Sequence, residues 1–163
     1  MALIVEDGTG LNNSNSYLSN ADFLAYCLSR NIDVSAYTET AIDAALLTCT
    51  VDYIDVYYCF RGEKLNDEQA LSLPTDLVGI NKDIQNATAN GAYLHLQGLL
   101  LIDESAINQG GDIKSQQDKL DVLETKTEYI EGTASKSKRD TPIMDRLLNK
   151  YSAFGAGPRL VIA

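Results

Sequence analysis

The amino-acid sequence predicts a mainly α-helical protein: a small helical bundle of three to four helices with a late β-hairpin or extended loop and strand-like termini. Three observations predict this fold class. Apolar residues recur every three or four positions over several long segments. Glycine and proline separate these segments. Hydrophobic residues make up 45% of the 163 residues, which is enough for a core.

We expect one domain, residues 1–163. Its predicted parts are an N-terminal arm at 1–18, a helical core at 19–104, a hairpin or loop region at 105–141, and a last helix with a C-terminal arm at 142–163. The arm begins with a short apolar, strand-like segment at Ala2 to Val5, followed by a polar, turn-rich stretch. Such an arm is either a loop on its own chain or a strand added to a neighbouring subunit.

The first helix is predicted from Ala21 to about Arg30, because Ser19 or Asn20 can cap it. Thr38 can cap a second helix that ends near Tyr58, since Gly62 follows and tolerates a left-handed conformation. Its apolar stripe contains Ile42, Leu46, Cys49, Tyr53 and Tyr57. Three acidic residues lie off this stripe and are expected to face water: Asp43, Asp52 and Asp55.

Four further elements are expected after the second helix. These are a short helix from Asp67 to Leu73 that Pro74 ends, a third helix from Ile80 to Ile102, a β-hairpin or extended loop at 112–130, and a last helix from Pro142 to about Phe154. Gly91 and Gly98 lie on the apolar stripe of the third helix, which indicates a close helix–helix approach. Arg159 to Ala163 is a possible terminal strand.

Two segments carry a family resemblance. The string DYID-x-x-Y-x-F-R-G-x-x-L-x-x-x-Q-A-L-x-x-P runs from Asp52 to Pro74, and the chain opens with MALIVEDGTG followed by Asn-Ser-Tyr. Both resemble the tailed-phage head–tail connector (adaptor) family, often catalogued as DnaT-like. The resemblance implies a structural corner after the second helix, made by Asp52, Tyr53, Tyr58, Phe60, Arg61, Gly62, Leu65, Gln69 and Pro74. Thr75 and Leu73 depart from the family, which often has an arginine and an aromatic residue there.

The resemblance also implies a function. A connector is a virion structural protein that docks beneath the portal protein as a ring, typically of twelve copies, and joins the head to a tail-completion (stopper) or tail protein. Double-stranded DNA passes through its channel without specific binding. The implied location is the virion neck, after synthesis in the host cytoplasm. Candidate partner contacts are Ala2, Leu3, Ile4, Val5, Arg159, Leu160, Val161 and Ile162. Arg61 is expected to pair with Asp55 or Asp52.

A second hypothesis is a single-stranded-DNA-binding replication accessory protein, which is what the label DnaT-like suggests. Such binding needs a basic groove with aromatic side chains on which bases stack. The net charge of −10 disfavours bulk attraction to nucleic acid, and the basic residues are concentrated after Gly110. A third hypothesis is a helical interaction protein with no role in the virion, which would be a stable monomer.

No pattern of catalytic chemistry is present, so we expect no enzymatic activity, no cofactor and no metal. Cys27, Cys49 and Cys59 lack the spacing of a metal site and are expected to be reduced thiols. His95 is expected to be a partly buried structural residue. The longest apolar run is interrupted by polar residues, so we expect no membrane span and no secretion signal.

Overall fold

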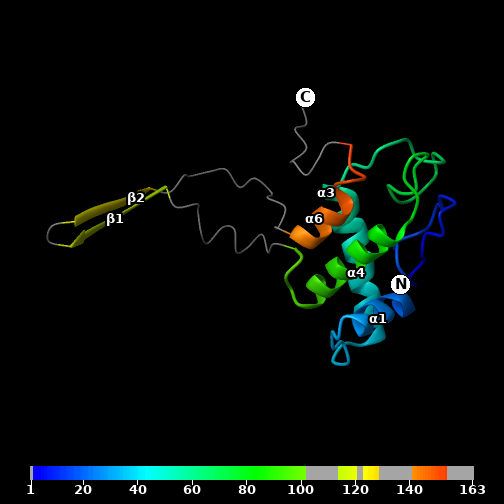
Figure 1. Cartoon of the computed structure of the whole chain (residues 1–163), viewed down its shortest axis with the longest axis horizontal. Helices are drawn as coiled ribbons and strands as arrows, with labels where there is room; N and C mark the ends of the chain where they lie inside the picture. The colour runs from blue at the N-terminus through cyan, green and yellow to red at the C-terminus, as the bar shows by residue number, and fades with distance from the viewer. Residues whose placement is uncertain (1, 102–113, 121–122, 129–140, 154–163) are drawn as a thin grey trace. The chain divides into compact units, whose positions relative to one another are not determined.

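The computed structural model describes residues 2–101, 114–120, 123–128 and 141–153, and the described chain is mainly helical (Figure 1). The helices are α1 (Asn20–Ser29), α2 (Glu39–Thr48), η1 (Cys49–Ile54), α3 (Asp55–Tyr57), α4 (Lys82–Leu96) and α6 (Pro142–Leu148). The chain divides into two compact units. The helical unit comprises residues 1–101 and 140–163, and the second unit comprises residues 102–139. The predicted fold class is confirmed as mainly helical.

The second unit contains two strands, β1 (Lys114–Leu120) and β2 (Leu123–Glu128). They pair antiparallel, with Gln116 opposite Thr127 and Leu120 opposite Leu123. The register shifts once, between Lys114 and Ser115. Of the predicted hairpin or loop region at 105–141, only residues 114–120, 123–128 and 141 are described, and the possible strand at 159–163 lies wholly outside the described residues.

Local hydrogen bonds start the first two helices where the sequence predicts. The Ser19 hydroxyl accepts from the Asp22 amide at 3.1 Å, which caps α1. The Thr38 hydroxyl accepts from the Ala41 amide at 3.2 Å and caps α2. Glu39 adds a carboxylate in the first turn, where the helix dipole favours negative charge. Both predicted caps are confirmed.

The helices α2, η1 and α3 follow one another without a break from Glu39 to Tyr57. Their middle, η1, is π-helical, and the Asp55 amide donates to the Thr50 carbonyl five residues earlier. The helix ends at Tyr58, whose backbone is extended. The predicted end of the helix is therefore confirmed, but Gly62 is not the residue that ends it. Gly62 instead occupies a later turn with φ +89°, where a Cβ atom would collide with Asp76.

The helix α4 begins two residues after the predicted start at Ile80 and ends six residues early. The prediction of a helix to Ile102 is wrong, because Gly98 has φ +69° and ends α4. The Gly98 amide donates to the His95 carbonyl and the Leu99 amide to the Leu94 carbonyl, both at 2.8 Å. This is the Schellman arrangement, which satisfies the last carbonyls of a helix. Gly98 therefore caps the helix and does not lie on its packing stripe.

Gly91 lies where three helices meet, and here the prediction of close approach is confirmed. A Cβ atom on Gly91 would collide with the sulfur of Cys49 on η1 and lie 2.9 Å from the terminal methyl group of Met144 on α6. Cys49 and Met144 are both fully buried. The absence of a side chain at this position lets α4 pack directly against η1 and α6.

The N-terminal segment folds back on its own helical unit. The Glu6 carboxylate is 3% exposed and accepts from the amides of Gly8, Gly10 and Leu11 and from the Ser14 hydroxyl, at 2.8 to 3.0 Å. The Leu11 carbonyl accepts from the Ala70 amide at 3.0 Å. The prediction of an N-terminal strand is wrong for the described residues, since only a single parallel bridge joins Val5 and Ser16.

The segment from Asp67 to Leu73 is irregular, so the predicted short helix is wrong. The buried amide side chain of Gln69 donates to the carbonyls of Leu71 and Pro74, each at 2.9 Å. These bonds satisfy backbone groups that a helix would otherwise pair. The last helix also ends earlier than predicted, at Leu148, and Tyr151 lies in the turn that follows.

Candidate functional site

Four exposed basic side chains of the helical unit come from three segments that meet in space: Arg61, Lys82, Arg146 and Lys150. The Arg61 guanidinium donates to the Lys150 carbonyl at 2.6 Å, and the Arg61 amide donates to the Tyr151 carbonyl at 3.0 Å. The Lys150 ammonium lies 2.7 Å from a carboxylate oxygen of Asp83, which follows Lys82 in α4. We call these four residues, together with Tyr151, the basic face.

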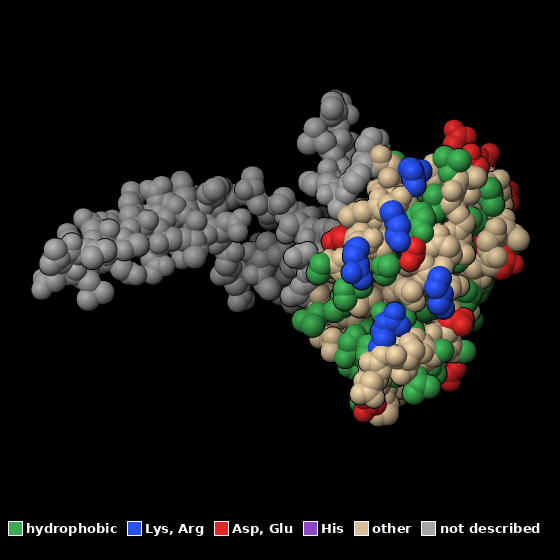
Figure 2. All heavy atoms as spheres, viewed as in Figure 1, with side chains coloured by type: hydrophobic (Ala, Val, Ile, Leu, Met, Phe, Trp, Pro, Cys, Tyr) green, Lys and Arg blue, Asp and Glu red, His purple; other side chains and the backbone are tan. Residues whose placement is uncertain are grey.

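Packing between α4 and α6 holds the segments of this face together (Figure 1). Met144 and Leu148 bury one side of α6. On its exposed side α6 carries Arg146, four residues before Lys150. The hydrogen bond to Asp83 raises the pKa of Lys150, and the positive charge of Arg146 acts against this rise, which indicates that the two cations lie near each other. Figure 2 shows lysine and arginine side chains gathered on the face that carries α4 and α6, with most visible carboxylates toward its margins.

Two tyrosine hydroxyl groups fix α6 to the end of the long helix. The Tyr58 hydroxyl donates to the Asp145 carboxylate at 2.7 Å. The Tyr53 and Thr141 hydroxyl groups share a hydrogen bond of 2.9 Å. Burial raises the pKa of both tyrosines, that of Tyr53 to about 12, so both hydroxyl groups stay protonated at neutral pH. These contacts set the position of the segment that bears Arg146 and Lys150.

Tyr151 is the aromatic residue of the basic face. It is half-buried, and its hydroxyl donates to the same Asp83 oxygen at 2.7 Å. The Lys150 ammonium lies 5.6 Å from the centre of the Tyr151 ring. Hydrogen bonding by Lys150 and Tyr151 lowers the pKa of Asp83, so this carboxylate is ionised at neutral pH. A partly exposed ring beside cations has the composition of a site for nucleic-acid bases.

The family-motif residues fall into two groups. Tyr53, Tyr58, Phe60, Gln69 and Pro74 are buried, whereas Asp52, Arg61, Gly62 and Leu65 are exposed. Phe60 forms an antiparallel bridge with Ser152, and the Cys59 carbonyl accepts from the Ala153 amide at 2.7 Å. Residues 59–61 of the motif therefore lie along the backbone of residues 150–153. Among the predicted partner contacts Ala2 is exposed, Leu3, Ile4 and Val5 are half-buried, and Arg159 to Ile162 lie outside the described residues.

The predicted pairing of Arg61 with Asp55 or Asp52 is wrong. The Arg61 guanidinium instead donates a hydrogen bond to the Lys150 carbonyl. The Asp55 carboxylate accepts from the Tyr17 hydroxyl at 2.6 Å and from the Ser72 amide at 2.8 Å. It therefore does not face water as predicted. Burial raises the pKa of Asp55, although its two donors act in the opposite direction.

Sequence reasoning did not single out Asp83, Lys150 or Tyr151. The available signal was the pair Lys150-Tyr151, a cation directly beside an aromatic residue near the end of a helix. The partner carboxylate, Asp83, lies 67 residues earlier in the chain. Its role could be read only from the packing of α4 against α6.

The sequence matches the model of a protein family described as "Putative DnaT-like ssDNA binding protein" over residues 1–162. The chain belongs to this family. No match was found among curated proteins or among solved structures.

Membership of the DnaT-like single-stranded-DNA-binding family corrects the connector resemblance. The match extends over nearly the whole chain, and no phage connector family is shown. The predicted virion structural role is therefore wrong, and with it the predicted portal, tail and ring partners and the channel for double-stranded DNA. The alternative, binding of single-stranded DNA, is the hypothesis that the family supports.

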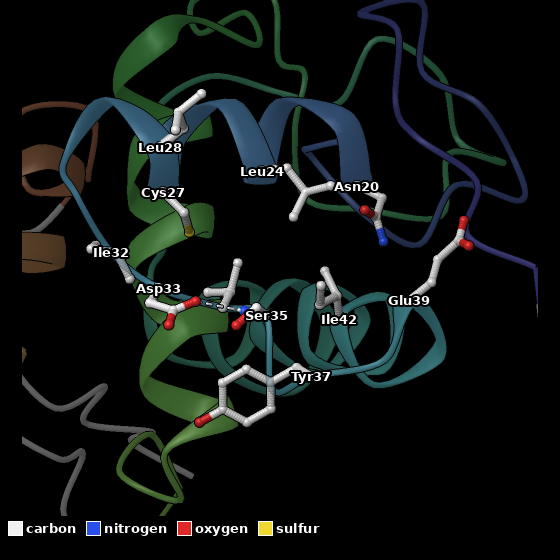
Figure 3. A pocket seen from close by; sticks show the side chains of 11 residues that line it. Asn20, Leu24, Cys27, Leu28, Ile32, Asp33, Ser35, Tyr37, Glu39 and Ile42 are labelled. Carbon is white, nitrogen blue, oxygen red and sulfur yellow. Dashed lines mark hydrogen bonds between the residues drawn. The ribbon is translucent and has the colours of Figure 1, made fainter.

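A second feature of this DnaT-like chain is an open hollow of about 670 Å³ between α1, the following loop and the start of α2. Figure 3 shows Leu24 and Cys27 of α1 pointing across it toward α2, where Ile42 lies. Its lining is Asn20, Leu24, Cys27, Leu28, Ile32, Asp33, Val34, Ser35, Tyr37, Glu39 and Ile42. Two carboxylates and no lysine or arginine line it, so it does not suit a phosphate-bearing ligand.

Three further observations concern the described residues only. They contain no group of three or more histidine, cysteine or acidic side chains placed to hold a metal ion. None of their helices has the length and apolar character that crossing a bilayer requires. All three cysteines are free, and Cys27 and Cys49 are buried.

Proposed function

We propose that this protein binds single-stranded DNA through the basic face. The observation that carries this proposal is the convergence of Arg61, Arg146 and Lys150 beside the ring of Tyr151. Cations neutralise phosphates along the strand, and an aromatic side chain stacks on bases without regard to sequence. The description of the family supports the same ligand.

The net charge of −10 does not oppose this proposal, because the charge is unevenly placed. Local potential governs where a charged ligand binds, and a cationic surface on an acidic protein still attracts phosphate at short range. Salt screens exposed charges over about 8 Å at physiological ionic strength, which is shorter than the width of the helical unit. Acidic residues on distant surfaces therefore weaken binding at the basic face less than their number suggests.

The test is fluorescence anisotropy of a labelled oligothymidylate, titrated with the full-length chain over a salt series. Lys82→Ala combined with Arg146→Ala should weaken binding by about tenfold and make the salt slope shallower by roughly 0.7 for each phosphate that is no longer neutralised. Within the described residues neither cation makes an ion pair, so their removal should not unfold the protein.

The matched control is Arg30→Ala. Arg30 is also exposed, but its guanidinium lies 3.7 Å over the ring of Tyr26 on α1, a helix that makes no contact with α6. Affinity should stay within about twofold of the wild type, because one distant charge is screened. An equal loss per removed charge in both variants would mean that only net charge matters. Absence of saturable binding by the wild type would reject the proposal.

We also propose that the protein binds DNA without catalysing a reaction. Its sequence lacks the usual patterns of nucleophile and base, and the cations of the basic face are suited to holding phosphate. Incubation with labelled single-stranded DNA should leave the strand intact on a denaturing gel, and its shortening would reject this proposal. The predicted location in the virion neck is not tested by any of these observations and stays a prediction.

A further inference from the structure

One carboxylate oxygen of Asp83, beside the basic face, accepts hydrogen bonds from two side chains of the segment that follows α6. The Lys150 ammonium and the Tyr151 hydroxyl both lie 2.7 Å from Oδ2 of Asp83. An ionised carboxylate oxygen and a non-bridging phosphate oxygen accept the same charge-assisted hydrogen bonds at the same distances. Lys150 and Tyr151 therefore present donors in the arrangement that one phosphate oxygen requires, and Asp83 occupies it.

This contact is open to a ligand from solvent. The side chain of Lys150 is 49% exposed and that of Asp83 is 31% exposed. Exposed ion pairs contribute little to stability and are screened by salt. A DNA strand that also contacts Arg146 can therefore replace the carboxylate at small cost.

The two donors stay in place without Asp83, because Arg61 holds their backbone. Its guanidinium donates to the Lys150 carbonyl at 2.6 Å and its amide to the Tyr151 carbonyl at 3.0 Å. The start of α4 does not depend on the Asp83 carboxylate either. The Asn81 side chain caps this helix by accepting from the Asp83 amide at 3.0 Å and from the Ile84 amide at 3.2 Å.

We propose that Lys150 and Tyr151 form a subsite for one phosphate of single-stranded DNA, and that Asp83 keeps this subsite closed until a strand replaces its carboxylate. The inference rests on the proposed function and adds to it an internal competitor. In the wild type, Asp83 lowers the affinity for DNA because it occupies the subsite. A strand that contacts Arg146 and Lys82 at the same time displaces the Asp83 carboxylate more readily than a lone phosphate does.

The test is Asp83→Asn in the full-length chain, measured with the same labelled oligothymidylate. The asparagine removes the negative charge and keeps the side-chain shape. We expect affinity to rise by about five- to tenfold and the salt slope to steepen by roughly 0.7, the contribution of one more neutralised phosphate. Adding Lys150→Met to Asp83→Asn should abolish the gain, because the freed ammonium is what binds the phosphate.

The control is Asp67→Asn. Asp67 is exposed, lies in the turn after Leu65, and makes no hydrogen bond within the described residues. The Asp67→Asn variant loses the same single negative charge, so its change in DNA affinity measures the general effect of weaker repulsion between the protein and DNA. An Asp83→Asn variant that binds no more tightly than Asp67→Asn would overturn the proposal. The melting temperature of each variant checks that the fold is retained.

A second readout separates this proposal from the proposed function. Inorganic phosphate is titrated into Asp83→Asn protein with labelled tyrosine rings, and the Tyr151 resonance is followed by NMR. A saturable shift that Lys150→Met removes supports the subsite even if oligothymidylate does not bind to the wild type. If the wild type binds DNA but neither readout responds to Asp83→Asn, the subsite is rejected and the proposed function stands.

Discussion

Asp55 is an acidic residue on a helix whose environment reverses the usual pH dependence of a carboxylate. Burial raises its pKa above the ordinary value of 3.8, while the Tyr17 hydroxyl and the Ser72 amide act against this rise. The folded state therefore binds the proton more tightly than the unfolded state. The contribution of Asp55 to stability is largest below pH 3.8 and falls as the pH rises through the folded-state pKa.

The direction of this pH dependence can be measured by comparing the wild type with Asp55→Asn, whose side chain does not titrate. The variant should be less stable at every pH, because an amide can accept only one of the two hydrogen bonds. The stability advantage of the wild type should shrink as the pH rises from about 3 to about 8. Urea unfolding of both proteins over this range gives the difference directly, and other acidic groups cancel in it. An advantage that grows with pH would show that the two donors outweigh the effect of burial.

Tyr58 offers a second test at the scale of one residue. Its side chain is 5% exposed and its hydroxyl donates to Asp145 at 2.7 Å. Tyr58→Phe should lower the free energy of unfolding by about 1.5 kcal/mol, because a hydrogen bond to a charged acceptor is removed. Tyr57→Phe is the control, since the Tyr57 side chain is 36% exposed. It should change stability by less than about 0.5 kcal/mol in the same chemical denaturation. Equal effects would mean that the Tyr58 hydroxyl is not a specific link between the helices.

Among the helices, the junction at Gly91 depends most on the size of one side chain. Gly91→Ala gains about 1 kcal/mol of helix propensity but forces a methyl group against Cys49 and Met144, at a cost of about 1–3 kcal/mol. We expect a net loss of about 1 kcal/mol. Adding Cys49→Ala should recover part of it, because the colliding sulfur is removed.

The control for this junction is Gly79→Ala. Gly79 lies in the loop before α4, where a new methyl group would meet no atom within 4 Å. Thermal unfolding should show little change for this variant. If Gly91→Ala were as stable as the wild type, the helices would have moved apart to admit the methyl group, and the close contact would not be rigid.

The elements show which parts of the fold can be predicted from sequence. The caps Ser19 and Thr38 were predictable because a capping side chain and the amide it accepts from are three residues apart. The end of α4 was not, because apolar spacing continues past Gly98 even though the glycine turns the chain. The short helix predicted from Asp67 to Leu73 is wrong for a different reason: Gln69 is buried, and its side-chain amide bonds the nearby carbonyls of Leu71 and Pro74, which outweighs helix propensity.

The candidate site was less predictable than the fold. Arg61 was singled out, but its partner is the backbone carbonyl of Lys150, and a carbonyl has no sequence signature. Asp55 was placed in water because it lies off the apolar stripe, yet the N-terminal segment brings Tyr17 over it. Both errors come from contacts between residues far apart in sequence, which periodicity does not detect.

At the scale of the whole molecule, we expect the helical unit to fold without residues 102–139, which separate its two parts in the sequence. Residues 102–139 form a separate compact unit, whereas α6 packs against α4, and the Tyr53 and Tyr58 hydroxyl groups bond Thr141 and Asp145. Replacing these residues by a linker of about ten glycine and serine residues should leave the helical circular dichroism signal intact. It should change the free energy of unfolding by less than about 1 kcal/mol, because the entropy of closing a connection changes only slowly with its length.

The same deletion tests how DNA binding is distributed. Residues 102–139 contain six lysine and arginine residues, as many as the described part of the helical unit. If the basic face binds DNA alone, the deletion should lower the affinity for oligothymidylate only modestly. Retention of fold with complete loss of binding would place the main contacts in the removed segment. Loss of the helical signal would show that the two units are not independent.

The contacts that close the helical unit join residues almost ninety positions apart, such as Tyr53 with Thr141 and Tyr58 with Asp145. During synthesis, about fifty residues are added between the end of α4 and the end of α6. At 5–20 residues per second this takes roughly 3 to 10 s. Through that interval the side of α4 that later packs against α6 has no covering helix. The nascent chain therefore exposes apolar surface of α4 for seconds, until α6 is synthesised and covers it.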